Sequence, residues 1–196
     1  MMDRREYLKL ASVAAVWPYA AAAAQPSGVI VNDLHSQLNA TRVHRIVEPQ
    51  TLDAVRDTLR AAKREQRAVC IAGGRHAMGA QAFATGGVLV DIRKLDRVLA
   101  FDSVRGLIEV ESGMQWPKLL AELRAAQRDR PVQWGFAQKQ TGADRLTLGG
   151  CLSANVHGRG LTLPPFVSDV ESFKLLDARG ELVNCSRTEH PELFRL

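Results

Sequence analysis

The chain lacks several patterns that would assign it to a common class of nucleotide-binding protein. It contains no G-x-x-x-x-G-K-[ST] motif, which excludes a P-loop nucleotide hydrolase, and no G-x-G-x-x-G fingerprint of a Rossmann dinucleotide fold. Its net charge of +5 is spread along the chain, without a block of lysines and arginines interleaved with aromatic residues. A nucleic-acid-binding role is therefore not expected.

Cysteine is also scarce. The three cysteines, Cys70, Cys151 and Cys185, lie far apart and form no C-x-x-C pair. This spacing predicts no tetrahedral zinc site, so no metal is expected, and an odd number of cysteines cannot form a complete disulfide framework. Cys70 is interpreted as a small apolar residue of a buried strand.

Residues 1–24 have the pattern of an export signal. Arg4 and Arg5 are followed by Tyr7, then by a weakly apolar stretch that ends in alanines. A charged start, an apolar middle and a small-residue end are typical of a secretory signal. The arginine pair resembles a twin-arginine signal, which predicts passage through the twin-arginine export machinery to a periplasmic or secreted location. Two alternatives remain, a first helix of the domain and a retained membrane anchor, although Pro18 does not favour a stable span.

The rest of the chain predicts an α+β fold. Strands are expected at 29–32, 42–47, 68–72 and 88–92, hairpins at 95–101 with 107–111 and at 170–176 with 181–185, and helices from Thr51 to about residue 65 and over 115–126. The helix at Thr51 has a favourable capping residue. The pattern divides near residue 97, giving a first lobe over 25–97 and a second, antiparallel-rich lobe over 98–196.

A glycine-rich stretch follows the short apolar strand at 68–72. Gly73 and Gly74 end the strand, and Arg75 and His76 come directly after them. Glycine allows backbone to approach a ligand closely, and successive N–H groups in such a turn can form an anion-binding nest. The stretch is thus either a phosphate cradle or an ordinary turn at the end of a strand.

A second glycine-rich stretch, 146–160, lies about 75 residues after the first, with a hairpin and a helix between them. This combination resembles the two-lobed, PCMH-type FAD-binding domain of the vanillyl-alcohol-oxidase-type flavoproteins, over roughly residues 42–196. Within that family the chain looks most similar to alditol and sugar-lactone oxidases and cytokinin dehydrogenases. The resemblance implies FAD as the cofactor, with the first stretch as its pyrophosphate loop and the second lining the flavin.

The resemblance also implies individual roles. His76 becomes a candidate for a covalent bond to the 8α-methyl group of the flavin, the alternative being a histidine that only hydrogen-bonds within the turn. Arg75 either contacts phosphate or points to solvent, and His157 is either a flavin neighbour or a loop residue. The cofactor-binding residues that the resemblance assigns are Gly73, Gly74, Arg75, His76, Ala77, Met78 and Gln81 in the first stretch, and Gly142, Thr147, Gly149, Gly150, Ser153, Asn155, His157 and Gly158 in the second.

Three departures from the family pattern limit these expectations. Ala77 replaces the usual serine, which removes one hydroxyl donor, and no cysteine lies near 142–146, so at most one covalent link is expected. The sequence stops at residue 196, where members of the family continue into a substrate domain. The chain is therefore expected to be an FAD-linked oxidoreductase, or its FAD-binding half, acting on a small alcohol, sugar or amine by hydride transfer to flavin N5. The alternative is a non-catalytic flavin-binding fragment, and no catalytic base is assigned.

Overall fold

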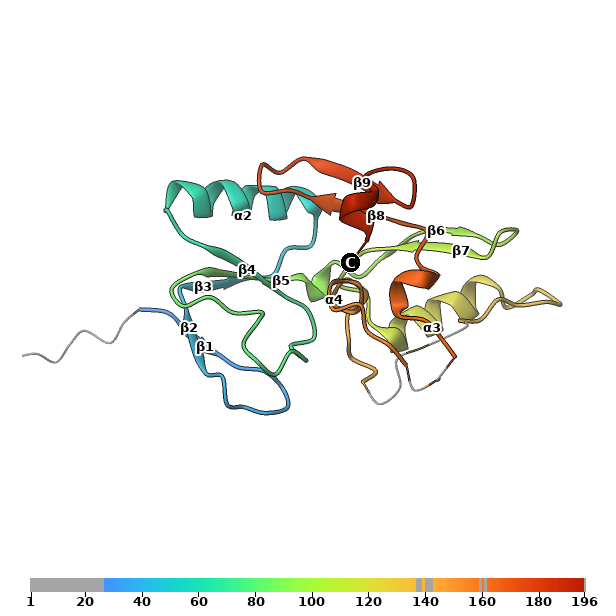
Figure 1. Ribbon diagram of the computed structural model, residues 1–196, viewed down its shortest axis with the longest axis horizontal. Helices are drawn as coiled ribbons and strands as arrows, with labels where there is room; N and C mark the ends of the chain where they lie inside the picture. Colours follow the sequence, from blue (N-terminus) through green and yellow to red (C-terminus); the bar gives the residue numbers. More distant parts are fainter. Residues whose placement is uncertain (1–26, 137–138, 140–142, 159, 161, 196) are drawn as a thin grey trace, which may run out of the picture.

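The computed structural model describes residues 27–136, 139, 143–158, 160 and 162–195. The predicted signal at 1–24 and the predicted site residue Gly142 lie outside them. The described residues form four small sheets with short helices beside them (Figure 1). This arrangement confirms the mixed α and β composition expected from the sequence.

The first half of the chain holds one antiparallel pair and one parallel sheet. The strands are β1 (Val29–Val31) paired with β2 (Thr41–Val43), and β3 (Arg45–Val47), β5 (Val88–Asp91) and β4 (Val69–Ala72) in that spatial order. β5 is buried along its whole length because it has a neighbour on each edge. The carboxyl ends of β4 and β5 therefore meet at one edge of the sheet, where Ala72 pairs with Asp91.

The single strand expected at 42–47 is two strands. The break falls at His44, whose N–H donates to the Gly87 carbonyl over 2.7 Å. Before His44 the chain pairs with β1, and after it the chain pairs with β5. A change of pairing partner is a long-range event, and alternation of side chains within 42–47 carries no sign of it.

Helix α2 (Leu52–Arg64) connects β3 to β4 across the parallel sheet. It begins as the sequence predicts, because Thr51 Oγ1 accepts a hydrogen bond from the Ala54 N–H over 3.2 Å. The helix buries Thr58 and Ala62, and Lys63 and Arg64 lie in the last turn, where positive charge favours the carbonyl end of the helix.

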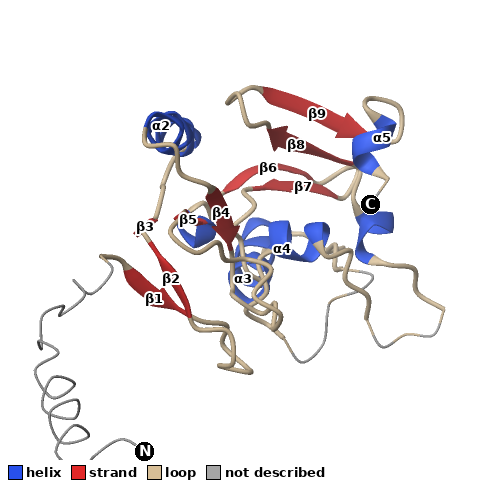
Figure 2. Cartoon of the chain, turned by 60° about the vertical axis from the view of Figure 1, so that its left-hand side comes forward, coloured by secondary structure: helices blue, strands red, loops and turns tan. Residues whose placement is uncertain are grey.

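The second half is built from two hairpins and three helices. In the described residues these are β6 (Val98–Asp102) with β7 (Leu107–Val110), β8 (Ser172–Leu176) with β9 (Leu182–Ser186), and α3 (Trp116–Ala126), α4 (Leu148–Ser153) and α5 (Pro191–Phe194), with the 3-10 turn η2 (Phe166–Asp169). Another 3-10 turn, η1 (Ile92–Lys94), directly follows β5 in the first half. The hairpins lie side by side (Figure 2), and Lys174 Nζ donates to Glu109 across them over 2.7 Å. The core of this half is centred on Trp116, which contacts Phe136 and Phe166 edge-on.

The two halves are in contact through several elements. Helix α2 lies beside the β8–β9 hairpin in Figure 1, and Arg56 Nε donates to the Gly180 carbonyl over 2.9 Å. Where the structure describes the chain, it shows no helix long and apolar enough to cross a bilayer.

Candidate functional site

The two glycine-rich stretches contact each other directly. A Cβ atom added at Gly73 would collide with the side chain of Thr147, and one added at Gly74 would collide with the Arg145 carbonyl. Both glycines thus leave room for Thr147 of the second stretch, and for the backbone of Arg145 just before that stretch, to approach the first stretch. Residues more than 70 positions apart in the sequence form one junction at the end of β4.

The first stretch has the geometry of an anion cradle. Arg75 adopts a left-handed conformation, with φ of 56°, directly after the two glycines. Among the described residues, no acceptor is found for the backbone N–H groups of Arg75, His76, Ala77 and Met78. A run of unpaired N–H groups around a left-handed residue is an arrangement that can bind an anion such as a phosphate.

The side chain of Arg75 anchors the loop to the sheet. Its Nη2 lies 3.2 Å from Oδ2 of Asp91, which is 1% exposed and also receives bonds of 2.8 and 2.7 Å from Arg93. Burial alone would raise the pKa of Asp91, but hydrogen bonds and charge from Arg93, with the charge of Arg75, outweigh it and lower the pKa. Arg75 Nε is buried without a hydrogen bond in the described part of the chain. The guanidinium of Arg75 therefore faces Asp91 rather than open solvent.

His76 is half-buried and paired with a second histidine. Its Nδ1 lies 2.6 Å from Nε2 of His35, and its Nε2 is buried next to Gly74, on the side of the Arg145 carbonyl, without a well-aligned hydrogen bond. Burial first, and the proximity of His35 second, lower the pKa of His76 below the ordinary histidine value. The imidazole is therefore neutral near pH 7, and a neutral imidazole has the free electron pair that a nucleophile needs.

The other predicted residues of the first stretch lie on its outer side. Ala77 and Met78 are exposed, and the Met78 carbonyl accepts a hydrogen bond of 2.5 Å from Asn39. Gln81 turns back on the loop, where its Oε1 accepts from the Gly79 N–H over 2.9 Å. Gln81 thus holds the shape of the turn in the free protein.

The second stretch begins with a capped helix that the sequence analysis missed. Thr147 Oγ1 accepts from the Gly150 N–H over 3.3 Å at the start of α4, and the residue is 1% exposed. Gly149 donates to the Ser112 carbonyl over 2.8 Å, and a Cβ there would press on the Ser112 side chain. The glycine pair is thus part of a short helix packed on the turn before α3, and the threonine that precedes it was the signal for an N-cap.

The remaining predicted residues follow α4. Ser153 donates to the Gly150 carbonyl over 3.3 Å, and Asn155, with φ of 39°, ends the helix and accepts from the Val167 N–H over 3.3 Å. His157 is exposed, and its Nδ1 lies 3.0 Å from the Gly158 carbonyl. The side chains of these residues thus bond to backbone groups near the second stretch. Gly142 lies outside the described residues.

Residues 32–39 form a loop that covers the first glycine-rich stretch, which the sequence pattern did not predict. Asp33 is buried in it and accepts hydrogen bonds from the N–H groups of His35 and Ser36 and from the Ser36 hydroxyl. Leu34 N–H donates to the Arg75 carbonyl over 3.0 Å. An aspartate three residues before a serine is a pattern typical of such local turns, and it could have been noticed.

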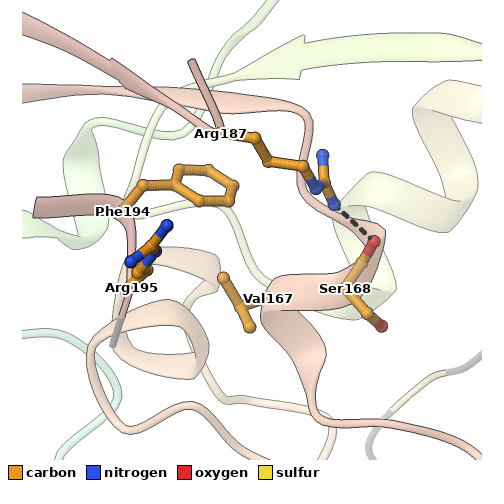
Figure 3. Close-up of a pocket in the computed structure, with 5 residues that line it drawn as sticks. All are labelled: Val167, Ser168, Arg187, Phe194 and Arg195. Carbon is orange, nitrogen blue, oxygen red and sulfur yellow. Dashed lines mark hydrogen bonds between the residues drawn. The ribbon is translucent and has the colours of Figure 1, made fainter. Parts of the chain in front are cut away.

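A hollow of about 350 Å³ lies beside α5 (Figure 3). Arg187 lies across it, donates to the Ser168 carbonyl over 3.0 Å and stacks 5.4 Å from the ring centre of Phe194. The hollow therefore lies where the end of β9, η2 and α5 pack against one another. In the described ranges, no group of three or more His, Cys, Asp or Glu side chains could hold a metal ion.

Comparison with known proteins supports the same assignment as the geometry. A sequence model of the FAD-binding domain family matches residues 43–186. Bovine L-gulonolactone oxidase is 30% identical over 149 residues, 76% of this chain and 32% of that protein. Mitochondrial L-galactono-1,4-lactone dehydrogenase 1 of rice is 28% identical over 170 residues, 84% of this chain and 28% of that protein. Cytokinin dehydrogenase 2 of Arabidopsis thaliana is 30% identical over 127 residues, 64% of this chain and 24% of that protein.

The chain thus spans about a third or less of the length of these curated relatives. The family match covers the parallel sheet, the junction of the two glycine stretches and both hairpins. Since the free N–H groups of the first stretch suit a diphosphate, the geometry and the comparison agree on the ligand. The chain belongs to the FAD-binding domain family, and FAD is its cofactor.

Proposed function

We propose that this chain is the FAD-binding part of an oxidoreductase that oxidises a small alcohol, sugar or amine. The observation that carries the proposal is the junction of the two glycine stretches, in which Gly73 and Gly74, directly before Arg75, lie against Thr147 and the Arg145 carbonyl at the start of α4. The printed names of the relatives, sugar-lactone oxidases and dehydrogenases and a cytokinin dehydrogenase, support redox chemistry on such substrates. When bound, the flavin would accept a hydride from the substrate at N5.

The residues of the chain would divide the work of binding. The N–H groups of Arg75 to Met78 bind the diphosphate, and the Asp91 carboxylate keeps Arg75 turned inward so that the loop holds its shape. The second stretch, from Thr147 to Gly158, flanks the ring system. We also propose that residues 25–97 and 98–196 act as the two lobes on either side of the cofactor, since the parallel sheet falls in the first range and both hairpins in the second.

We further propose that His76 forms the covalent bond to the flavin 8α-methyl group. Its low pKa and half-buried position beside the cradle support this role. In the attachment, one methyl C–H bond and the imidazole N–H bond break and one C–N bond forms. The two electrons and two protons released pass through the ring system to an electron acceptor such as dioxygen, so atoms and charge balance.

Binding of FAD to the chain from residue 25 onward tests these proposals. We expect FAD titration to quench flavin fluorescence and acid-denatured protein to retain a yellow, fluorescent band on a denaturing gel. Gly74→Ala should weaken binding at least about tenfold, or about 1.4 kcal/mol, because the added Cβ pushes the second stretch away. Gly135→Ala is the matched control, since a Cβ there meets no atom of the described residues within 4 Å. A wild-type chain that takes up no FAD would overturn the oxidoreductase proposal, and FAD released by acid would overturn the covalent bond alone.

The location of the protein is a separate proposal. We propose that residues 1–24 direct export by the twin-arginine machinery to a periplasmic or secreted location, on the strength of the Arg4–Arg5 pair and the apolar stretch that follows. Fusing residues 1–30 to a reporter protein that fluoresces after export in the folded state tests this. Replacing both arginines by lysine should retain the reporter in the cytoplasm, and continued export of that variant would contradict the proposal.

A further inference from the structure

The loop of residues 32–39 connects β1 to β2 and lies over the first glycine stretch. It makes three contacts with it in order along the chain. Leu34 N–H donates to the Arg75 carbonyl over 3.0 Å, His35 pairs with His76, and Asn39 Nδ2 donates to the Met78 carbonyl over 2.5 Å. The loop lies ahead of residues 43–186, so the family match does not account for it.

The loop is built to hold its shape without help from a ligand. Asp33 is fully buried, and its two carboxylate oxygens accept from the backbone of His35 and Ser36, from the Ser36 hydroxyl and from Asn39 Nδ2. The Ser36 hydroxyl bond outweighs the effect of desolvation and, with the other bonds, holds the pKa of Asp33 far below its ordinary value. An ionised carboxylate with this many donors fixes the backbone of His35, and therefore the place from which its side chain reaches His76.

The Arg145 carbonyl, together with His35, favours one tautomer of His76. That carbonyl and His76 Nε2 both border Gly74, and a carbonyl oxygen can only accept a hydrogen bond. The carbonyl therefore favours a proton on Nε2, which leaves an electron pair on Nδ1. His35 Nε2 lies 2.6 Å from that nitrogen and completes the arrangement by donating its own N–H.

We propose that His35 is a positioning residue for His76, holding its ring in one orientation and in the Nε2–H tautomer. The groups that face His76 are His35 from the loop and the Arg145 carbonyl from the second stretch, while the neighbouring Arg75 is turned to Asp91. The value of this arrangement for the cofactor rests on the proposed function, since an oriented, neutral imidazole is what covalent attachment requires. The tautomer itself is a property of the free protein.

The test is nitrogen-15 NMR of the histidine rings in the flavin-free chain from residue 25 onward, with His76 assigned by His76→Gln. In alkaline buffer, where His76 is neutral, we expect wild-type His76 to show one protonated nitrogen, Nε2, and one hydrogen-bonded, unprotonated nitrogen, Nδ1. His35→Phe and His35→Leu should move both shifts toward the average of two exchanging tautomers. His35→Gln, which keeps an N–H donor, should restore the wild-type shifts.

Two controls make the result decisive. His44→Phe removes a histidine from the same half of the protein and should leave the His76 signals unchanged, and far-ultraviolet circular dichroism checks that each variant is folded. Unchanged His76 shifts in folded His35→Phe and His35→Leu chains would overturn the inference even if FAD binds, and absence of FAD binding would overturn the proposed function without touching the NMR result.

Discussion

The two glycine-rich stretches meet at one site but use their glycines differently. In the first, Gly73 and Gly74 make room for atoms of the second stretch, and the left-handed conformation falls on Arg75, which is not a glycine. In the second, Gly149 and its neighbour lie inside a capped helix and allow it to pack on Ser112. Glycine in such motifs is therefore needed here for contacts within the protein. The proposed binding of the diphosphate rests on the backbone N–H groups of Arg75 to Met78, none of which is a glycine.

The largest difference in stability should come from the contact that fixes the first stretch, because Arg75 bonds to the buried carboxylate of Asp91 and no such ion pair is found in the described part of the second stretch. Asp91→Ala leaves Arg75 and Arg93 without their shared partner and removes the cap of η1. We expect the free energy of unfolding to fall by about 3 kcal/mol, the lower end for a broken buried ion pair, since both arginines are partly exposed. Urea denaturation measures it. Asp96→Ala, which breaks an exposed pair with Lys118, should cost less than about 1 kcal/mol, and equal losses would contradict the assigned role.

The same anchor predicts a pH dependence. The pKa of Asp91 is lowered in the folded protein, so its contribution to stability is present above the unfolded pKa, near 4, and is lost as pH falls toward the folded value. Thermal unfolding between pH 6 and pH 3 should show this loss. Asp91→Asn should flatten that part of the profile, leaving the part due to the other carboxylates whose pKa values are lowered, Asp33, Glu111 and Asp177 among them. A profile that is unchanged by the substitution would show that Asp91 does not titrate in this range.

The junction should respond unequally at its two glycines. Gly74→Ala brings a Cβ against the backbone carbonyl of Arg145, which cannot rotate away, whereas Gly73→Ala meets the side chain of Thr147. Forced overpacking of this kind costs about 1–3 kcal/mol, and we expect Gly74→Ala to lie near the upper end. Chemical denaturation compares the two, with Gly135→Ala as the neutral control. A larger loss at Gly73 would mean that the Thr147 side chain, rather than the Arg145 backbone, sets the distance between the stretches.

Local chemistry predicted much of the scaffold but only part of the site. Thr51 marked the start of α2, and glycine-containing turns separated the strands of both hairpins, because caps and turns depend on neighbouring residues. The partners of the first stretch could not be predicted in this way. His35 is 41 positions from His76, and Gly73 is 74 positions from Thr147, so these contacts depend on how separate elements pack. The alternation of apolar and polar residues that predicts strands carries no information about such pairings.

Removing the N-cap of α4 in the second stretch should lower the free energy of unfolding by less than removing Asp91 does. Thr147→Ala deletes the hydroxyl that accepts from the Gly150 N–H, and loss of an N-cap costs about 1 kcal/mol. Thr147→Ser keeps the hydroxyl and should retain most of the stability, although it loses the methyl group that packs near Gly73. Chemical denaturation gives the stabilities, and FAD titration reports whether the junction still forms. A serine variant as unstable as the alanine variant would assign the effect to packing instead of capping.

The smallest expected effect is on the rate at which Cys151 is alkylated, which measures how often the second stretch opens. Cys151 is fully buried in α4, and burial raises the pKa of its thiol to about 11. Because the thiolate is the reactive form, only about one molecule in a thousand carries it at pH 8. We expect Cys151 to resist alkylation in the folded chain, as judged by mass spectrometry of peptides after timed labelling. Since the Thr147 hydroxyl caps α4, Thr147→Ala should loosen α4 and speed labelling of Cys151 while leaving that of Cys70, on β4, unchanged. Equal acceleration at both cysteines would show that the two stretches open together, as one cooperative unit.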